Sequence, residues 1–451
     1  SEDGYAVVVE IVPGAAADKD GRLQPGDKIL GIQKDGPNGK KEEVDFVEKK
    51  LSDVVRHIRG DRGTTVELIV QPEGTKEKKI YKLVREKIEL KEQHAKGKTL
   101  QTKDAVGKDL KVGVISLPAF YGDTMALLRG DRDAVSATSD CRKLLDQFKK
   151  EKVDCVVVDL RGNGGGLLEE ARTLSGLFIN TGPVVQVRQA SGIQSLSDED
   201  EGTAWDGPLV VLIDKMSASA SEIFAGVIKD YNRGLIIGDA STFGKGTVQS
   251  IEPVSDRQRG PRKNLGALKL TIQQFYRANG ESTQILGVTP HVHIPSVHDH
   301  MDFGEGKMDN ALKFDKVDEL PHENYQRISD ELASVISKKS EERRKNDPKF
   351  KKQDEQIKKF LVRKERHTIP LNESKFRAEF FPEDQEEKIA EEKAKLDKKN
   401  KKKFRERDVW ISDYYNDEVL RIIADYLNLG SKIVAQAPEN APSNNRQAVE
   451  Q

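Results

Sequence analysis

The sequence is poor in cysteine, in long apolar runs and in net charge. Cys141 and Cys155 are the only cysteines among 451 residues, which excludes a disulfide-stapled scaffold and any cysteine-rich zinc or iron–sulfur module. No apolar run reaches the roughly 18 residues that a bilayer-spanning helix needs. The formal net charge is −1, from 75 basic and 76 acidic residues, which argues against a general attraction to nucleic acid or an anionic membrane.

The chain is nevertheless long enough for several hydrophobic cores. Its 451 residues suggest roughly three domains at about 150 residues each, and 36% of the residues are hydrophobic. It opens with Ser-Glu-Asp-Gly, which is neither a start methionine nor a signal peptide. We therefore expect a fragment of a longer precursor.

Composition divides the sequence into four segments. Residues 1–90 mix short β-rich runs with turns and predict a small first domain. Residues 91–298 begin with a lysine-rich connector, up to about residue 110, and then alternate apolar strands with helical patterns, as in a layered α/β domain. Residues 299–434 are rich in charges of both signs, which favours solvated helices. Residues 435–451 lack large aromatic side chains and are predicted to be disordered.

Hydrophobic periodicity predicts the main elements of these segments. In the first domain we expect a helix over 51–58 and strands over 5–12, 28–33, 64–70 and 79–84. In the α/β domain we expect helices over 167–178 and 220–231 and strands over 153–160, 209–213 and 235–237. Two apolar stripes in the charged region, at 325–335 and 419–426, predict helices, the second of which ends at Gly430.

Three glycine- or serine-rich segments follow strands of the α/β domain. They are Asp159-Leu-Arg-Gly-Asn-Gly-Gly-Gly166, Ser217-Ala-Ser-Ala-Ser-Glu222 and Thr242-Phe-Gly-Lys-Gly-Thr-Val-Gln249. Glycines let the backbone turn sharply and bring free N–H groups close to a ligand. Because ligands bind at the strand ends of such sheets, we expect the three loops to face one pocket.

Two chemistries compete for this pocket. A phosphate loop has four residues between its first glycine and Gly-Lys, then Ser or Thr, whereas five residues separate Gly238 from Gly244 and a glycine follows Lys245. The alternative is a serine activated by a lysine, because a serine hydroxyl is a weak nucleophile without an adjacent base. The lysine must be neutral, which requires a desolvated site such as Phe243 and its glycine neighbours would provide. We favour this second chemistry.

In this order, the three segments resemble those of the C-terminal processing proteases, most closely the tail-specific protease branch. The resemblance covers residues 5–295, and the charged region resembles the helical extension of that branch more loosely. It implies an α+β multidomain protein: an N-terminally truncated PDZ-like domain, a serine protease core with the crotonase/ClpP-like ββα fold, and a charged C-terminal helical domain. The PDZ loop that holds the substrate carboxylate in the family precedes the point where this chain starts.

The resemblance also assigns roles to individual residues. Ser219 matches the nucleophile, Lys245 its general base, and Gln249 the residue that orients the lysine. The backbone amides of Gly166 and Ala220 match the oxyanion hole.

Two further features of this part of the sequence are Asp230 and the spacing between Ser219 and Lys245. Asp230 matches an aspartate that supports activity in this branch, and at 11 residues after Ser219 it lies about three helical turns away, so we expect structural support from it. The interval from Ser219 to Lys245 is one residue longer than usual in the family, because the segment 239–242 is longer by one.

The implied function is an ATP-independent serine endopeptidase that degrades or processes proteins recognised by their apolar C-terminal tails. The resemblance implies no cofactor, no metal and no nucleic acid, and a bacterial cell envelope location, normally the periplasm. The charged helices are interpreted as a solvated face, with an adaptor-binding or self-association surface as the alternative. The rival function is a catalytically inactive PDZ-containing peptide-binding or scaffold protein. An acyl-CoA-type enzyme on the same fold is disfavoured because its site does not need a serine–lysine pair.

Histidine and cysteine are the other residue types in this sequence that could bind a metal or form a bridge. His291, His293 and His298 fall with a fourth histidine in residues 291–300, yet no Glu-x-x-His or cysteine framework accompanies them, so we expect no metal site. Cys141 and Cys155 are expected to be buried small side chains and not a bridge.

Overall fold

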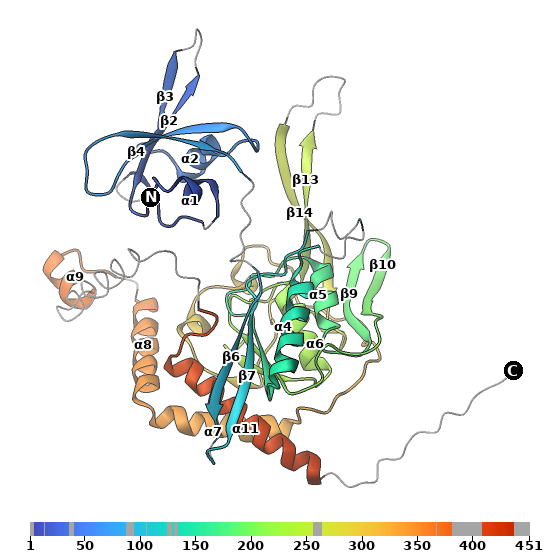
Figure 1. The fold of residues 1–451 in the computed structure, drawn as a ribbon. Coiled ribbons are helices and arrows are strands. Elements are labelled where there is room, and N and C mark those ends of the chain that lie inside the picture. The colour runs from blue at the N-terminus through green and yellow to red at the C-terminus, as the bar shows by residue number, and fades with distance from the viewer. Residues whose placement is uncertain are drawn as a thin grey trace. The chain divides into compact units, whose positions relative to one another are not determined.

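The computed structural model describes residues 4–12, 14–35, 40–86, 94–104, 106–123, 129, 134–255, 264–366, 368–380 and 408–436 (Figure 1). The chain falls into two compact units. The first comprises Ser1–Glu92 and His367–Asp408, and the second comprises Gln93–Arg366 and Val409–Gln451.

The first unit contains a five-stranded sheet and short helices, of which α1 and α2 contact the sheet. Its sheet order is β1-β2-β4-β5, with β3 paired to β2, and all pairs are antiparallel. The strands are β1 (Ala6–Val7), β2 (Lys28–Asp35), β3 (Lys41–Asp45), β4 (Thr65–Gln71) and β5 (Lys79–Val84). The helices are α1 (Ala16–Asp20), α2 (Leu51–Ile58) and α9 (Glu373–Phe380).

The core of the first unit confirms most of its expected elements. Ile32 of β2, Val54 of α2 and Leu68 of β4 are buried together in one cluster. The strand expected over residues 5–12 is wrong in length, since the strand itself covers only Ala6–Val7. Val8 still exchanges backbone hydrogen bonds with Gly26 and Asp27, but the chain turns there, just before β2 begins at Lys28, so no strand lies opposite the residues that follow.

The second unit contains two sheets. The larger has the order β15-β12-β11-β8-β7-β6, in which only β6 runs antiparallel to its neighbour. Its strands are β6 (Lys96–Lys103), β7 (Asp109–Ser116), β8 (Cys155–Asp159), β11 (Leu209–Ile213), β12 (Leu235–Gly238) and β15 (Val292–His293). The smaller antiparallel sheet has the order β10-β9-β14-β13, from β9 (Gly182–Gln189), β10 (Gly192–Asp198), β13 (Thr247–Ser255) and β14 (Asn264–Tyr276).

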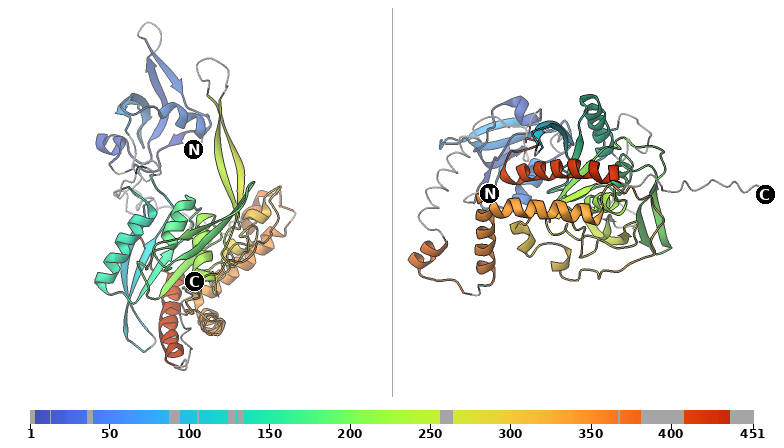
Figure 2. Two further views of the ribbon diagram at one scale, coloured as in Figure 1. Left: turned by 90° about the vertical axis from the view of Figure 1, so that its right-hand side faces the viewer. Right: turned by 90° about the horizontal axis from the view of Figure 1, so that it is seen from below.

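Helices cover both faces of the larger sheet. Val156 and Val158 of β8 pack on the side of α4 (Ala137–Glu151), α5 (Leu168–Ser175) and α6 (Ala220–Asp230). Cys155 and Val157 point to the other side, in one cluster with α7 (Asp330–Asn346), α8 (Pro348–Lys364) and α11 (Tyr414–Gln436). Figure 2 shows α7 and α11 side by side. Because these helices share one buried cluster with the sheet, they are part of the core of this unit. Each fully buried aliphatic side chain in it stabilises the folded state by about 1.5–3 kcal/mol.

Three expectations for this unit are corrected. The connector expected over residues 91–110 contains β6, whose lysines suit the exposed edge of a sheet. The stripe at 325–335 is not one helix, because α7 begins only at Asp330. The helix expected to end at Gly430 continues to Gln436, since Gly430 keeps a helical backbone. Of the predicted disordered tail, residues 437–451 lie outside the described residues.

None of the helices in the described part of the chain is both long and apolar enough to cross a bilayer.

Candidate active site

The three loops singled out in the sequence meet at one edge of the larger sheet, as expected. They follow β8, β11 and β12, which are parallel neighbours, so their carboxyl ends lie together. Ala218 N donates to Asn163 O at 3.0 Å, which joins the serine loop to the glycine loop. Phe243 N donates to Ser217 O at 2.9 Å, which joins the lysine loop to the serine loop.

Ser219 occupies a strained turn at the start of α6. Its φ of 57° and ψ of −112° lie where side chains are rarely tolerated, which costs on the order of 1–3 kcal/mol. The turn places Ser219 at the N-terminus of α6, where unsatisfied N–H groups and the helix dipole favour negative charge. The Ala220 amide, the first of the helix, has no hydrogen-bond acceptor among the described residues.

The glycine loop packs directly on this turn. A Cβ at Gly165 would lie 2.9 Å from the Ser219 Cβ and 2.7 Å from Ala218 O, closer than side chains approach. Gly165 N donates to Asn163 Oδ1 at 2.9 Å, whereas Gly166 N has no acceptor within the described ranges. The amides of Gly166 and Ala220 are therefore both without an acceptor among the described residues, as an oxyanion hole requires of its donors.

If Ser219 is the nucleophile that the resemblance implies, replacing Gly165 with alanine is expected to lower cleavage by roughly tenfold to a hundredfold. The new methyl group would collide with the Ser219 turn, and the Gly165 φ of +100° disfavours any side chain. Gly164→Ala is the matched control, because a Cβ there meets nothing within 4 Å. Steady-state cleavage of a peptide substrate by both variants tests this, and equal rates would contradict the close approach at Gly165.

One buried carboxylate holds the serine and lysine loops together. Glu222 Oε2 accepts from Ser219 N at 2.7 Å and from Lys245 N at 2.9 Å. Its Oε1 accepts from Thr242 Oγ1 at 2.6 Å and from Gly244 N at 2.7 Å. Burial raises the pKa of Glu222 to about 7, and these four hydrogen bonds oppose the rise.

Glu222 had no role in the sequence analysis, although its position carries a signal. Ser219-Ala-Ser-Glu222 has the Ser-x-x-Glu pattern of a capping box, in which the glutamate bonds the N-cap amide. That pattern predicts the bond to Ser219 N alone. The bonds to the lysine loop depend on tertiary contacts.

Lys245 is half-buried and contacts Gln249. Its Nζ donates to Gln249 Oε1 at 3.4 Å, which brings the expected base and the expected orienting residue together. Among the described residues, no hydrogen bond joins Lys245 Nζ to Ser219 Oγ. The pKa of Lys245 is lowered, first by burial and then by the positive charge of Lys269, while Glu305 and Glu222 act in the opposite direction.

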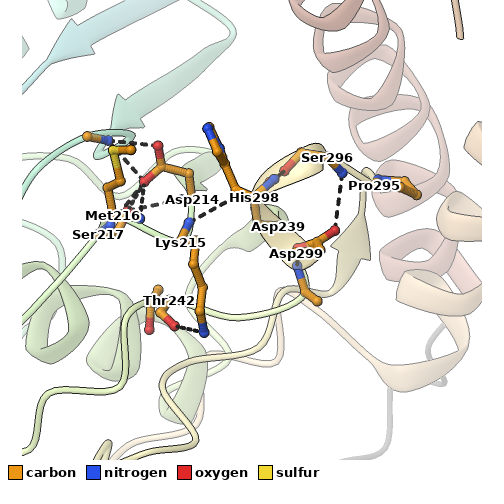
Figure 3. Close-up of polar contacts among 12 residues, drawn as sticks. Asp214, Lys215, Met216, Ser217, Asp239, Thr242, Pro295, Ser296, His298 and Asp299 are labelled. Carbon is orange, nitrogen blue, oxygen red and sulfur yellow. Dashed lines mark hydrogen bonds and ion pairs between the residues drawn. The ribbon is translucent and has the colours of Figure 1, made fainter. Parts of the chain in front are cut away.

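The lysine loop is braced from the serine loop by Lys215. Its Nζ donates to Ser241 Oγ and Thr242 O, both at 2.9 Å, and its amide donates to Asp239 Oδ2 (Figure 3). The neighbouring residue Asp214 accepts hydrogen bonds from the backbone amides of Ser217 and of Gly162 in the glycine loop. The longer loop noted in the sequence is therefore anchored at residues 239–242.

Asp230 lies at the far end of α6 from Ser219, about 16 Å along the helix at 1.5 Å per residue. Its carboxylate pairs with the guanidinium of Arg277, and the two side chains are 3% and 9% exposed. Arg277 follows β14, so the pair ties α6 to the smaller sheet. This geometry supports a structural role for Asp230.

The histidines and cysteines have structural contacts. His291 Nδ1 accepts from Ile236 N at 2.9 Å, and burial lowers the pKa of His291 to about 4. His293 contacts Asp299 at 2.8 Å and His298 lies 3.7 Å from Asp239. Both cysteines are free and buried. Burial raises the pKa of each thiol, which fits small core side chains.

Arg161 and Asn163 hold the glycine loop in place through contacts with other parts of the unit. Arg161 pairs with Asp159 and donates to Asn416 Oδ1 at 3.0 Å, near the start of α11. Asn163 Nδ2 donates to Leu117 O at 2.7 Å. The C-terminal helix thus contacts the loop next to Ser219.

Three family models match this chain in succession. Residues 1–71 match the PDZ domain, residues 111–294 match peptidase family S41, and residues 298–428 match the C-terminal domain of tail specific protease. The mixed α/β core, the PDZ domain and the C-terminal helices confirm the expected fold class.

The chain is also similar to individual proteases. The tail-specific protease of Haemophilus influenzae is 37% identical over 445 residues, which cover 96% of this chain and 60% of that protein. The carboxy-terminal processing protease CtpB of Bacillus subtilis is 29% identical, over 70% of this chain and 57% of that protein. A solved photosystem II D1 C-terminal processing protease is 25% identical, with 64% and 68% of the two chains covered and a TM-score of 0.38.

The chain thus spans about three fifths of the length of these curated relatives. It belongs to peptidase family S41, in which it combines a PDZ domain with the C-terminal domain of tail specific proteases.

Proposed function

We propose that this chain is an ATP-independent serine endopeptidase in which Ser219 is the nucleophile and Lys245 the general base. The observation that carries this proposal is the Glu222 carboxylate, one oxygen of which binds the backbone amides of both residues. A nucleophile and its base must be held in a fixed relation for proton transfer, and this shared acceptor fixes their backbones.

The acylation step follows from these positions. Neutral Lys245 takes the hydroxyl proton of Ser219 as the serine oxygen attacks the scissile carbonyl carbon. The amides of Gly166 and Ala220 stabilise the oxyanion, because neither has an acceptor among the described residues. Lys245 then gives its proton to the leaving amine, which releases the C-terminal fragment and leaves an acyl group on Ser219.

Deacylation uses the same groups. Lys245, neutral again, takes a proton from a water molecule that attacks the acyl carbonyl, and Ser219 regains its proton when the ester breaks. Gln249 orients the Lys245 ammonium through its side-chain oxygen. Burial of Lys245 favours its neutral form, which both steps need.

Substrates, partners and location are part of the proposal. PDZ domains bind extended peptides by adding a strand to a sheet edge, so we assign protein or peptide substrates with apolar C-terminal tails to this chain. The similarity to a bacterial tail-specific protease agrees with a cell envelope location, and within it we propose the periplasm, with an adaptor protein on the charged helices as the accompanying candidate. We divide the chain into a PDZ-like domain (1–90), a protease core (91–298), a helical C-terminal domain (299–434) and a tail (435–451).

Cleavage of an unfolded protein with an apolar C-terminal tail tests this function. The chain is expected to cut it at internal sites, and Lys245→Ala is expected to be inert while it still binds the tail. Binding without cleavage by either protein would instead support the inactive peptide-binding scaffold. A version of the substrate with a charged tail is expected to be cut more slowly if the PDZ domain selects the tail.

A further inference from the structure

The β13–β14 hairpin extends outward from the protease core, and its first strand begins close to Lys245 (Figure 1). β13 begins at Thr247, two residues after Lys245, and Gln249 is the acceptor for the Lys245 ammonium. A bulge between Val248 and Gln249 changes the pairing at this point. Bulges re-aim side chains next to active sites, so the bulge sets which hairpin residues share a face with Gln249.

The register identifies the neighbours of Gln249 on that face. Gln249 pairs with Thr271, and Ile251 pairs with Lys269. Residues opposite each other in an antiparallel pair, and residues two apart on a strand, share a face. Lys269 therefore lies on the Gln249 face, diagonally across the hairpin, where long side chains reach one another.

The charge of Lys269 is not neutralised locally. Its side chain is exposed, and no hydrogen bond or ion pair of that side chain is found among the residues that the structure describes. The other charges that act on Lys245 come from Glu222 of α6 and Glu305 of the short helix Glu305–Lys307. Glu222 is occupied by four donors, and Glu305 accepts from Gln284.

We propose that Lys269 is a positioning residue that places a second positive charge beside Lys245 and so keeps the general base neutral. Like charges disfavour each other, and a lysine beside another cation is a known way to activate an amine. The lowered pKa of Lys245, to which Lys269 contributes after burial, agrees with this geometry. This inference rests on the proposed function, because only a base that must be neutral benefits.

The pH profile of cleavage separates this role from a structural one. Lys269→Gln is expected to move the acid limb of kcat/KM to higher pH, because removal of the positive charge raises the pKa of Lys245. The rate is expected to fall roughly two- to fivefold at pH 7, the size of an exposed charge effect, and to match the wild type above the limb. Lys269→Arg is expected to restore the profile, and Lys150→Gln on α4 is the control for net charge.

Ionic strength and labelling complete the test. At about 1 M salt the wild-type limb is expected to move toward that of Lys269→Gln, because screening shortens the reach of an exposed charge. The pH dependence of acetic anhydride labelling at Lys245, measured by mass spectrometry, reports the same titration in a chain that does not cleave. Superimposed labelling curves for wild type and Lys269→Gln would overturn the inference, whereas absent cleavage with shifted curves would overturn only the proposed function.

Discussion

Ser219→Ala is expected to lower the rate of peptide cleavage by roughly ten-thousandfold or more, to the level left by binding and the oxyanion donors. The alanine side chain keeps the Cβ atom of Ser219 and lacks only the attacking oxygen. The backbone amides of Gly166 and Ala220 stay free. Single-turnover cleavage of a fluorescent peptide measures the loss, and retention of more than a few per cent of the rate would show that Ser219 is not the nucleophile.

Ser219→Gly makes the same experiment informative about strain. It is expected to be as inactive as the alanine variant but more stable, by about 1 kcal/mol, because glycine tolerates a φ of 57° and serine does not. Ser219→Ala keeps the strained backbone, so its free energy of unfolding is expected to equal that of the wild type. Urea unfolding of the two variants compares them, and equal stabilities would mean that the turn stores no strain.

Glu222→Gln is expected to lower activity by roughly a hundredfold or more and to destabilise the second unit by about 2–4 kcal/mol. A carboxylate accepts all four hydrogen bonds, whereas a glutamine places its NH₂ group against two of the donors. Each buried donor left without an acceptor costs about 1–3 kcal/mol. Loss of these bonds also frees the Ser219 and Lys245 loops from one another.

The control for this change is Glu169→Gln on α5. It makes the same chemical substitution in an exposed ion pair with Arg172, so it is expected to cost less than about 1 kcal/mol and to leave activity unchanged. Urea unfolding and peptide cleavage are measured on both variants under conditions where each is folded. Full activity of folded Glu222→Gln would show that the shared carboxylate does not set the site geometry.

Elements with strong local signals were predictable from the sequence. The helix at Leu51–Ile58 and the strand at Leu209–Ile213 match their predicted bounds. The helix has apolar residues at helical spacing, and the strand is a short continuous apolar run, so each pattern indicates its element locally. β6 and the β13–β14 hairpin were missed, since both are polar or exposed over much of their length. Such strands are stabilised by pairing with a neighbouring strand, and the sequence of one short segment does not indicate which strand that will be.

The sequence by itself determined the family, the three loops and the identity of the candidate nucleophile and base. Those features are local: glycines and small residues at strand ends specify tight turns, and Ser219 and Lys245 lie inside them. Only the tertiary structure decided how the loops are joined. Glu222 reaches Thr242 and Lys245 across 20 and 23 positions, and hairpin register places Lys269 on the same face as Gln249. Contacts between distant positions depend on how strands pair and helices pack, and that information is absent from any single segment.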